Sequence, residues 1–337
     1  MTQNRRRIAV LTSGGDAPGM NAAIRSVVLC GTALNFEVIG VERGYDGLMR
    51  GSFVEFSQRV LDENLHRGGT LLRSARSHEF MTREGRAQAI EHLRRAGIEG
   101  LVVIGGDGSF AGALALDREG MPTVGIPGTI DNDIACTDVS IGFDTALNTV
   151  IHAVNQLRDT AYSHDRVYVV EVMGRNSGYI ALYSGLAVGA EAILIPEIPE
   201  DLDNLVAKID QVHKAGKAHS IVIVAEGVGG VPSSTRRYEE SAGFRVAQYI
   251  SEHSHHETRV TILGHLQRGG SPTASDRLLA SRLGEAAVRL LARGVSGRMV
   301  GIQQNRVVDV PLEDAIGKPK PIDREYYELA SLLTAVV

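Results

Sequence analysis

The sequence predicts an α/β fold with two doubly wound, mostly parallel sheets. Short apolar runs, which are typical of buried parallel strands, alternate with helical patterns along the whole chain. Several of these runs stop at loops rich in glycine or aspartate. The chain has 337 residues, which is enough for two domains of ordinary size. This alternation indicates right-handed crossovers, with helices on both faces of each sheet.

The apolar periodicity places the individual elements. Strands are expected at residues 8–11, 36–41, 101–104, 123–126, 167–172, 192–195, 220–225 and 260–263. Helices are expected from residue 21 to about 34 and at 84–96, 110–119 and 145–158. Residues 44–48 are expected to form a turn, because they contain two glycines and an aspartate.

Two neighbouring loops in the middle of the chain carry the strongest functional signal. The first is Gly105-Gly106-Asp107-Gly108-Ser109, and the second is Pro127-Gly128-Thr129-Ile130-Asp131-Asn132-Asp133. Glycines let backbone N–H groups surround phosphate oxygens, and the N-terminus of the following helix favours negative charge. The aspartates suit magnesium ligation and acceptance of a hydroxyl proton. Neither loop contains lysine, so neither is a Walker A site. The sequence therefore predicts a polyphosphate site of another kind.

The same order of strand, Gly-Gly-Asp and helix occurs earlier, at Gly14-Gly15-Asp16. The two glycine loops could face one phosphate chain from neighbouring strands, although an ordinary βα turn would also explain the glycines. Arg76 is a candidate for neutralising a transferring phosphoryl group, because guanidinium stays charged and binds two oxygens at once.

Charge and composition exclude several other classes. The formal net charge of -5 gives no overall attraction to nucleic acid or anionic membrane. The arginines at positions 5–7 are interpreted as a solvated entry to the first strand. No apolar run approaches the length of a membrane span or of a signal-peptide core, so a cytoplasmic location is expected. Cys30 and Cys136 show neither metal-site nor disulfide-framework spacing and are interpreted as reduced core thiols.

Five motifs, in this order and spacing, resemble those of bacterial 6-phosphofructokinases. They are the stretch from Leu11 to Asn21, Arg67-Gly68-Gly69-Thr70, the two central loops taken together, Val172-Met173-Gly174-Arg175, and the stretch from Leu263 to Pro272. The resemblance extends over nearly the whole chain.

The resemblance implies how the phosphoryl donor is held. ATP would be bound by Gly15, Arg76, Ser77, Gly106, Asp107, Gly108 and Ser109, with Asp107 contacting Mg²⁺. Thr129 would touch the transferring group, and Arg175 would offset its charge. Asp131 is the expected base toward the sugar's 1-hydroxyl, and Asp133 a supporting carboxylate near the metal.

The resemblance also implies a fructose 6-phosphate site. Its expected residues are Thr129, Ile130, Asp131, Arg166, Met173, Gly174, Arg175, Glu226, Arg259, His265, Leu266, Gln267 and Arg268. In the family, Arg166 and Arg259 come from a neighbouring subunit, which implies a homo-oligomer, in the family's pattern a homotetramer. The implied domains are residues 1–141 plus about 266–316 for ATP and about 142–265 plus 317–337 for the sugar, with the active site between them.

Two glycines bear on the choice of donor. Family members that use pyrophosphate typically carry aspartate where this chain has Gly108 and lysine where it has Gly128. Aspartate there would occupy room needed by the α-phosphate of ATP, so the two glycines favour ATP over a pyrophosphate-dependent or mixed-donor enzyme.

The family's enteric-type effector site is only partly present. Arg25, Arg158, Glu191 and Lys217 match its positions. Three further basic positions of the pattern are Leu29, Ser52 and Ala215 here, although Lys214 stands next to the last of these. Weak or altered control by ADP and phosphoenolpyruvate is therefore expected.

Other functions explain less of the chain. An NAD kinase would account only for the first central loop. A non-catalytic sugar-phosphate sensor would not need Asp107, Asp131 and Asp133. A Rossmann dehydrogenase is disfavoured because the glycines after Gly106 miss the Gly-x-Gly-x-x-Gly spacing by one residue.

Overall fold

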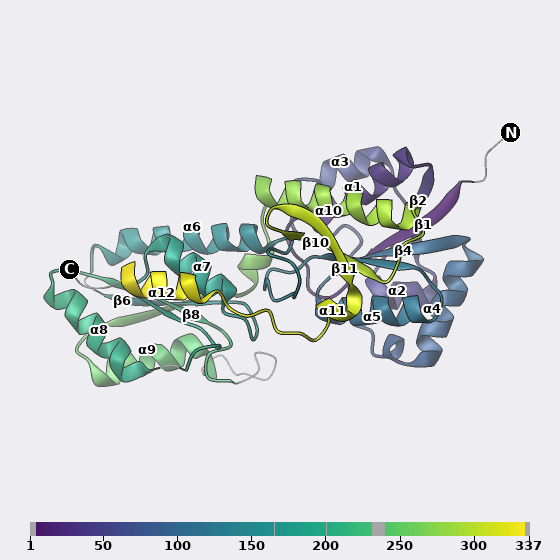
Figure 1. The fold of residues 1–337 in the computed structure, drawn as a ribbon. Coiled ribbons are helices and arrows are strands. Elements are labelled where there is room, and N and C mark those ends of the chain that lie inside the picture. Colours follow the sequence, from purple (N-terminus) through teal and green to yellow (C-terminus); the bar gives the residue numbers. More distant parts are fainter. Residues whose placement is uncertain (1–4, 165, 200, 231–239, 334–337) are drawn as a thin grey trace. The chain divides into compact units, whose positions relative to one another are not determined.

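The structure is a computed structural model that describes residues 5–164, 166–199, 201–230 and 240–333 (Figure 1). Parts of the predicted polar start and of the predicted C-terminal segment, residues 1–4 and 334–337, lie outside the described residues. The strands are β1 (Arg6–Thr12), β2 (Phe36–Val41), β3 (Phe53–Glu55), β4 (Ile98–Gly105), β5 (Thr123–Pro127), β6 (Val167–Val172), β7 (Ala192–Leu194), β8 (Ser220–Ala225), β9 (Thr258–Ile262), β10 (Arg298–Gln303) and β11 (Arg306–Pro311).

Helices connect these strands. The α-helices are α1 (Met20–Ala33), α2 (Gly44–Arg50), α3 (Gln58–Asn64), α4 (Arg83–Arg95), α5 (Asp107–Arg118), α6 (Phe143–Ala161), α7 (Tyr179–Val188), α8 (Leu202–Lys214), α9 (Ala242–His253), α10 (Ala274–Ala292), α11 (Leu312–Ala315) and α12 (Arg324–Leu333). Short 3₁₀ helices lie at η1 (Glu79–Met81) and η4 (Gly264–Arg268). Across the described ranges, no helix combines the length and apolar character that crossing a bilayer would require.

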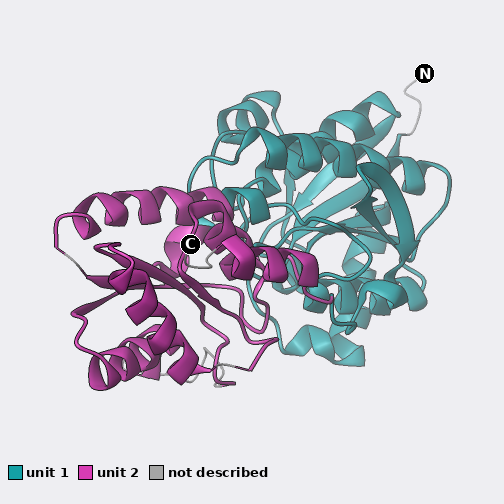
Figure 2. Cartoon of the chain, turned by 60° about the vertical axis from the view of Figure 1, so that its left-hand side comes forward, with its two compact units in different colours: residues 1–130, 134–145, 268–320 teal, residues 131–133, 146–267, 321–337 magenta. Residues whose placement is uncertain are grey.

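The chain divides into two compact units, which Figure 2 colours separately. Unit 1 contains Met1–Ile130, Ile134–Thr145 and Arg268–Lys320. Unit 2 contains Asp131–Asp133, Ala146–Gln267 and Pro321–Val337. Each unit has its own sheet, so the predicted fold class of two doubly wound, mostly parallel α/β sheets is confirmed.

Unit 1 is built on a sheet whose described strands follow the order β11-β10-β5-β4-β1-β2-β3. The five inner strands run parallel, and only the outermost pairs, β2 with β3 and β10 with β11, are antiparallel. Helices α1 and α10 lie on one face, and α2, α4 and α5 on the other (Figure 1). The chain passes from β1 to β2 on one side and then returns to β4 on the other. The strand order therefore reverses between β1 and β4, where open α/β sheets bind ligands.

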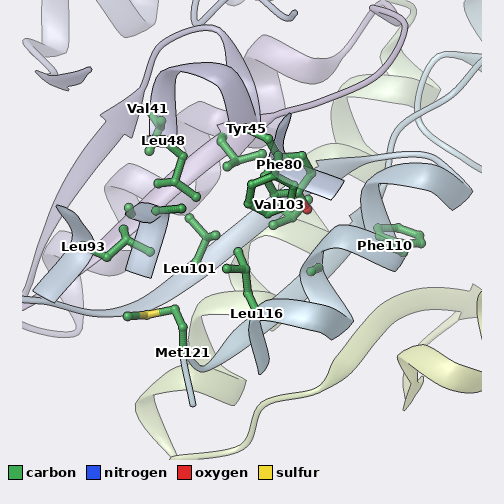
Figure 3. Packing of buried hydrophobic residues seen from close by; sticks show 14 of the residues in the cluster. Val41, Tyr45, Leu48, Phe80, Leu93, Leu101, Val103, Phe110, Leu116 and Met121 are labelled. Atoms are coloured by element: carbon green, nitrogen blue, oxygen red, sulfur yellow. The ribbon is translucent and has the colours of Figure 1, made fainter. Parts of the chain in front are cut away.

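The core on the α5 face of this sheet joins strands and helices that lie far apart in the sequence. Leu101 and Val103 of β4 pack with Leu93 of α4 and with Phe110 and Leu116 of α5 (Figure 3). Their complete burial fixes α5 on the sheet, and with it the glycine loop from which α5 starts.

Three expectations for unit 1 were wrong. Residues 44–48 belong to helix α2, because Tyr45, Leu48 and Met49 form one buried helical face that outweighs the glycines. Helix α5 starts at Asp107, three residues earlier than expected, because Gly106 already accepts the first helical hydrogen bonds. Arg6 and Arg7 lie within β1 and pair with Glu99 and Glu37 at 2.9 Å, so they are part of the sheet and do not lead into it.

Unit 2 is built on a parallel sheet whose described strands follow the order β7-β8-β6-β9. Helices α8 and α9 lie on one face, and α7 and α12 on the other (Figure 1). The predicted bounds of β6 and β8 are confirmed, whereas β9 begins two residues earlier than expected, at Thr258.

Both cysteines are free thiols. Both are half-buried, and Cys136 packs against the hydrophobic core of unit 1, as expected for a core thiol.

Candidate active site

The two glycine loops follow the neighbouring strands β1 and β4, as the sequence predicts. Thr12 stands opposite Ile104 in the parallel register, and the Ser13 amide donates to the Ile104 carbonyl at 3.0 Å. A Cβ on Gly105 would lie 2.5 Å from the Ser13 carbonyl oxygen and 2.5 Å from Ser109 Oγ. Only glycine fits there, because the two loops approach each other backbone to backbone at the reversal of strand order.

The glycine loop after β4, from Gly105 to Ser109, leads into the first turn of α5. The first N–H groups of a helix have no partner inside it, so a helix start of this kind is suited to bind an anion. The Tyr45 hydroxyl donates to the Ser109 carbonyl at 2.5 Å, and the Tyr45 ring stacks on Phe80 at 4.0 Å between ring centroids. Burial raises the pKa of Tyr45, so this hydroxyl keeps its proton and remains a donor. Tyr45 and Phe80 therefore fix the position of the first turn of α5.

Asp107 is exposed at this helix start, and its Oδ1 accepts a hydrogen bond from the Gly317 amide at 2.6 Å. Among the described residues, no group of three or more His, Cys, Asp or Glu side chains could enclose a metal ion. A single exposed carboxylate nevertheless fits Mg²⁺, which commonly takes one or two carboxylates and otherwise water and substrate phosphates. The residues present are thus compatible with a metal held mainly by a nucleotide.

Side chains from other segments donate hydrogen bonds to the glycine loop after β1, Gly14-Gly15-Asp16. Arg268 Nη1 donates to the Asp16 carbonyl at 3.0 Å, and Ser74 Oγ donates to the Gly14 carbonyl at 2.7 Å. Ser74 is two residues before Arg76, which is exposed, and Ser77 Oγ accepts from the Phe80 amide at 3.3 Å. Unit 1 thereby brings together the predicted residues Gly15 and Arg268, with the Arg76 segment tied to the same loop.

The loop after β5 is clamped from one side. The Ile141 amide donates to the Pro127 carbonyl at 3.0 Å, and Ser140 Oγ donates to the Thr129 carbonyl at 2.7 Å. Thr129 and Ile130 are buried, and a Cβ on Gly106 would lie 3.9 Å from Thr129 Cβ. Thr129 therefore lies next to the glycine turn that starts α5 in unit 1.

Asp131 and Asp133 are grouped with unit 2. Asp131 is 4% exposed, and its backbone carbonyl accepts from Ser177 Oγ at 3.0 Å. Asp133 is half-buried, and Asn132 between them has φ 51, a left-handed conformation that asparagine tolerates. At this turn the chain passes from the first segment of unit 1, which ends at Ile130, to residues 131–133, which are grouped with unit 2.

Unit 2 brings together four of the predicted sugar-binding residues. The Arg175 amide donates to Glu226 Oε1 at 2.8 Å, and the Met173 amide donates to Gln267 Oε1 at 3.3 Å. The two loops follow the neighbouring strands β6 and β8 and touch closely, because a Cβ on Gly227 would lie 2.1 Å from the Arg175 carbonyl oxygen. Gly174 has φ 137, and its Cβ would lie 2.3 Å from the Ser177 carbonyl oxygen, so this turn also requires glycine.

His265 and Leu266 lie in η4 with Gln267, and both side chains are exposed. Buried Gln267 donates to the Gly264 carbonyl at 3.1 Å and so links η4 to Met173. His265 follows β9 in sequence, and the bond between Gln267 and Met173 joins its segment to the residue that follows β6.

Arg166 and Arg259 are not part of this group. Both pair with Glu257, Arg166 at 2.7 Å, and Arg166 holds the pKa of Glu257 below its usual value. Arg166 precedes β6, and Arg259 stands opposite Tyr168 at the start of β9. Met173 follows the other end of β6. At 3.3 Å per strand residue, the five to seven residues that separate these arginines from Met173 along the sheet amount to roughly 20 Å. One chain therefore does not bring these arginines to Met173 and Glu226.

Comparison with known proteins decides the family. The family model described as Phosphofructokinase matches residues 7–291, well over half of the chain. The chain belongs to the phosphofructokinase family. The ATP-dependent 6-phosphofructokinase of Halothermothrix orenii is 53% identical over 330 residues, covering 98% of this chain and 99% of that protein. The enzyme of the same name from Clostridium tetani is 54% identical over 329 residues, covering 98% and 99%.

Solved phosphofructokinases share the fold. The enzyme of Saccharomyces cerevisiae is 36% identical with a TM-score of 0.82, over 97% of this chain and 46% of that chain, so this chain spans about half of the yeast chain's length. A pyrophosphate-dependent phosphofructokinase from Marinobacter aquaeolei also has a TM-score of 0.82, at 23% identity over 95% and 86% of the two chains. At that identity the likeness concerns the fold alone, so the overall fold does not distinguish the two kinds of donor.

Sequence reasoning missed several residues that support these loops. They are Tyr45, Ser140, Ser177, Asp276 and the amide of Gly317. Most are joined to the loops only through long-range contacts, which no local pattern reveals. For Asp276 a signal existed, since it lies three residues after Thr273, in the spacing of a helix cap.

Proposed function

We propose that this phosphofructokinase transfers the γ-phosphoryl group of ATP to the 1-hydroxyl of D-fructose 6-phosphate, giving fructose 1,6-bisphosphate and ADP. The observation that carries the proposal is the complete set of family loops on a chain 53% identical, nearly end to end, to proteins named ATP-dependent 6-phosphofructokinase. The activity belongs to glycolysis, and a cytoplasmic location is part of the proposal for that reason.

The geometry at Gly108 supports ATP as the donor. A Cβ at Gly108 would meet no described atom within 4 Å, so packing does not require glycine here. The open space suits a nucleotide's α-phosphate, which an aspartate side chain would displace and repel. At Gly128, by contrast, a Cβ would lie 3.0 Å from Ile104 and 3.3 Å from Met20, so a lysine there would need those buried side chains to move.

Each step of the transfer has a residue in these loops. Gly15, Arg76, Ser77 and the turn from Gly106 to Ser109 would hold ATP, and Asp107 would hold Mg²⁺, which neutralises phosphate charge when bound. Thr129 would orient the transferring group, and Arg175 would balance its charge. Asp131 would accept the proton of the sugar's 1-hydroxyl, and Asp133 would support the metal side of the site.

The sugar phosphate would be held by residues from two chains. Met173, Gly174, Glu226, His265, Leu266, Gln267 and Arg268 would come from one subunit. Arg166 and Arg259 would come from its neighbour, because they lie roughly 20 Å from Met173 along the small sheet of their own chain. The active form would then be a homo-oligomer, and we propose a homotetramer. Unit 1 would bind ATP, and unit 2, together with Arg268 of unit 1, would bind the sugar phosphate.

A donor assay tests the proposal. Purified protein is given fructose 6-phosphate with ATP or with pyrophosphate, and its mass in solution is measured alongside. Turnover should require ATP and Mg²⁺. Gly108→Asp should lower turnover with ATP and leave the thermal unfolding midpoint nearly unchanged, because the added side chain meets open space. Faster turnover with pyrophosphate than with ATP in the unaltered protein would refute the choice of donor.

A further inference from the structure

A buried carboxylate in unit 1 connects two helices to the loop after β5. Asp276, in the first turn of α10, is 1% exposed. Its Oδ1 accepts from the Gly142 amide at 2.8 Å, and its Oδ2 accepts from the Thr145 amide at 2.8 Å and from Thr145 Oγ1 at 2.5 Å. Burial raises the pKa of Asp276, and these three hydrogen bonds oppose that rise. Such a buried carboxylate is stable only with its donors in place.

The starts of α6 and α10 cap each other. Thr273 is the N-cap of α10 and accepts from the Asp276 amide at 3.2 Å. Thr273 Oγ1 donates to Asp144 Oδ2 at 2.5 Å, and the Thr273 amide donates to Thr145 Oγ1 at 3.1 Å. The hydrogen bonds of these four side chains join the starts of two helices that lie 128 or more residues apart in the sequence. The first turn of α6 cannot shift without breaking several of these hydrogen bonds.

The residues just before α6 hold the loop after β5. Ile141 pairs with Gly128 as an isolated parallel bridge and donates to the Pro127 carbonyl, and Ser140 donates to the Thr129 carbonyl. Asp276 therefore connects to Thr129 through an unbroken path, from its carboxylate to the Gly142 amide and then along the backbone to Ser140. Asp131, the proposed base, follows Thr129 by two residues.

This path has little freedom to relax. A Cβ on Gly142 would lie 2.6 Å from Ala17 Cβ, and one on Gly19 would lie 2.7 Å from Ile141 Cγ2 and 3.5 Å from Asp276 Cβ. The segment is consequently packed against the stretch that continues the first glycine loop into α1. Movement at residues 140–142 would have to displace that stretch as well.

We propose that Asp276 is a positioning residue, which fixes residues 140–145 so that they hold Pro127 and Thr129 in the geometry required for phosphoryl transfer. Asp276 itself touches neither substrate in this scheme. The catalytic part of this inference rests on the proposed function, and its structural part does not.

Asp276→Asn and Asp276→Ala separate positioning from mere stability. Asparagine keeps one acceptor oxygen and the shape, whereas alanine leaves two buried amides without their acceptor. Misplacing reacting groups by about 1 Å costs on the order of 10²-fold in rate. We expect kcat to fall roughly 10-fold for asparagine and roughly 100-fold for alanine. The KM values for ATP and fructose 6-phosphate should stay within about threefold, because the binding side chains are unchanged.

Asp201→Ala is the matched control. Asp201 also caps a helix with its carboxylate, accepting from the Asn204 amide at 2.9 Å at the start of α8, but it has no place in the path above. It should leave kcat unchanged. Asp276→Asn with the kcat of the unaltered protein would overturn the proposal, and so would an equal loss of kcat in Asp201→Ala.

A double-mutant cycle with Ser140→Ala tests the path itself. Losses of kcat in Asp276→Asn and Ser140→Ala should be less than multiplicative when combined, because both variants loosen the same loop. Strictly multiplicative losses would contradict the path. Amide hydrogen exchange gives a readout that does not depend on activity: peptides covering residues 127–131 and 140–145 should exchange faster in Asp276→Asn and not in Asp201→Ala. Unchanged exchange there would refute the structural part, whereas an unaltered protein inactive with ATP would refute only the proposed function.

Discussion

Replacing Asp131 by asparagine removes the proposed base and little else. Asp131 is 4% exposed and asparagine has nearly the same volume, so no cavity forms. The Asp131 carbonyl keeps its hydrogen bond from Ser177, because that bond involves only the backbone of residue 131. The loss of stability should therefore be about 1 kcal/mol or less. The loss of turnover should be far larger, since removing a general base typically costs ~10²- to 10⁴-fold, or about 3–5 kcal/mol of transition-state stabilisation.

The assay compares kcat and KM of Asp131→Asn with those of the unaltered protein at saturating ATP and Mg²⁺. The KM for fructose 6-phosphate should change by less than about threefold while kcat falls, which is the pattern of an interaction made only in the transition state. Asp309→Asn serves as a control, because Asp309 on the edge strand β11 pairs with Arg298 on β10 at 2.6 Å, away from the loops. A correctly folded Asp131→Asn protein with kcat within about threefold of the unaltered protein would remove Asp131 from the role of base.

Three further predictions concern assembly, regulation and pH. Mixing the inactive variants Asp131→Asn and Arg259→Ser should restore activity in hybrid oligomers, and hybrids that stay inactive after verified subunit exchange would show that each chain builds its own pocket. ADP or phosphoenolpyruvate at millimolar concentration should barely move the midpoint of the fructose 6-phosphate saturation curve. The expected effector site has few cations to offer, because Arg25 pairs with Asp62 at 2.9 Å, Lys217 pairs with Glu191, and Leu29 stands where the family pattern has a cation. A large shift of the midpoint by either compound would contradict this prediction. Burial raises the pKa of the Glu197 carboxyl, whose Oε1 accepts from the Gly178 amide at 2.8 Å. The folded protein therefore binds the carboxyl proton more readily than the unfolded chain does. Its stability should fall as pH rises above 4.5, the ordinary pKa of glutamate. Glu197→Gln should flatten that part of the plot of unfolding midpoint against pH, and an unchanged slope would assign the dependence to other groups.

The sequence was most informative where one physical signal dominates. The bounds of β6 and β8 could be predicted because both six-residue strands consist mainly of β-branched and other apolar residues, apart from Glu171 in β6 and Ser220 in β8. The glycine loops could be predicted because Gly105 and Gly174 occupy positions where any side chain would collide with a backbone oxygen.

Sequence reasoning failed where tertiary contacts decide. The outermost strands β3 and β11 were not expected, since β3 has only three residues and β11 is largely exposed. β10 was also not expected, although its residues Met299 to Ile302 are buried. The contact of Asp276 with Thr145 joins residues 131 apart, and neither residue stands out locally except as a cap. The bond from the Arg175 amide to Glu226 likewise depends on the pairing of β6 with β8, which periodicity alone does not predict.

The order of strands in unit 1 constrains how the chain can be made. β5 pairs on one side with β4, which precedes it closely, but its other neighbour β10 begins at Arg298. Most of the residues of unit 2 are synthesised between these two strands. During translation the continuous segment from Ala146 to Gln267 can fold around its own parallel sheet, while the edge of β5 that later pairs with β10 is still unpaired. A nascent or truncated chain that ends before β10 would keep that edge open, and open edges of buried strands invite aggregation. The sheet of unit 1 is therefore completed only after most of unit 2 has been synthesised, although unit 1 contains the first residues of the chain.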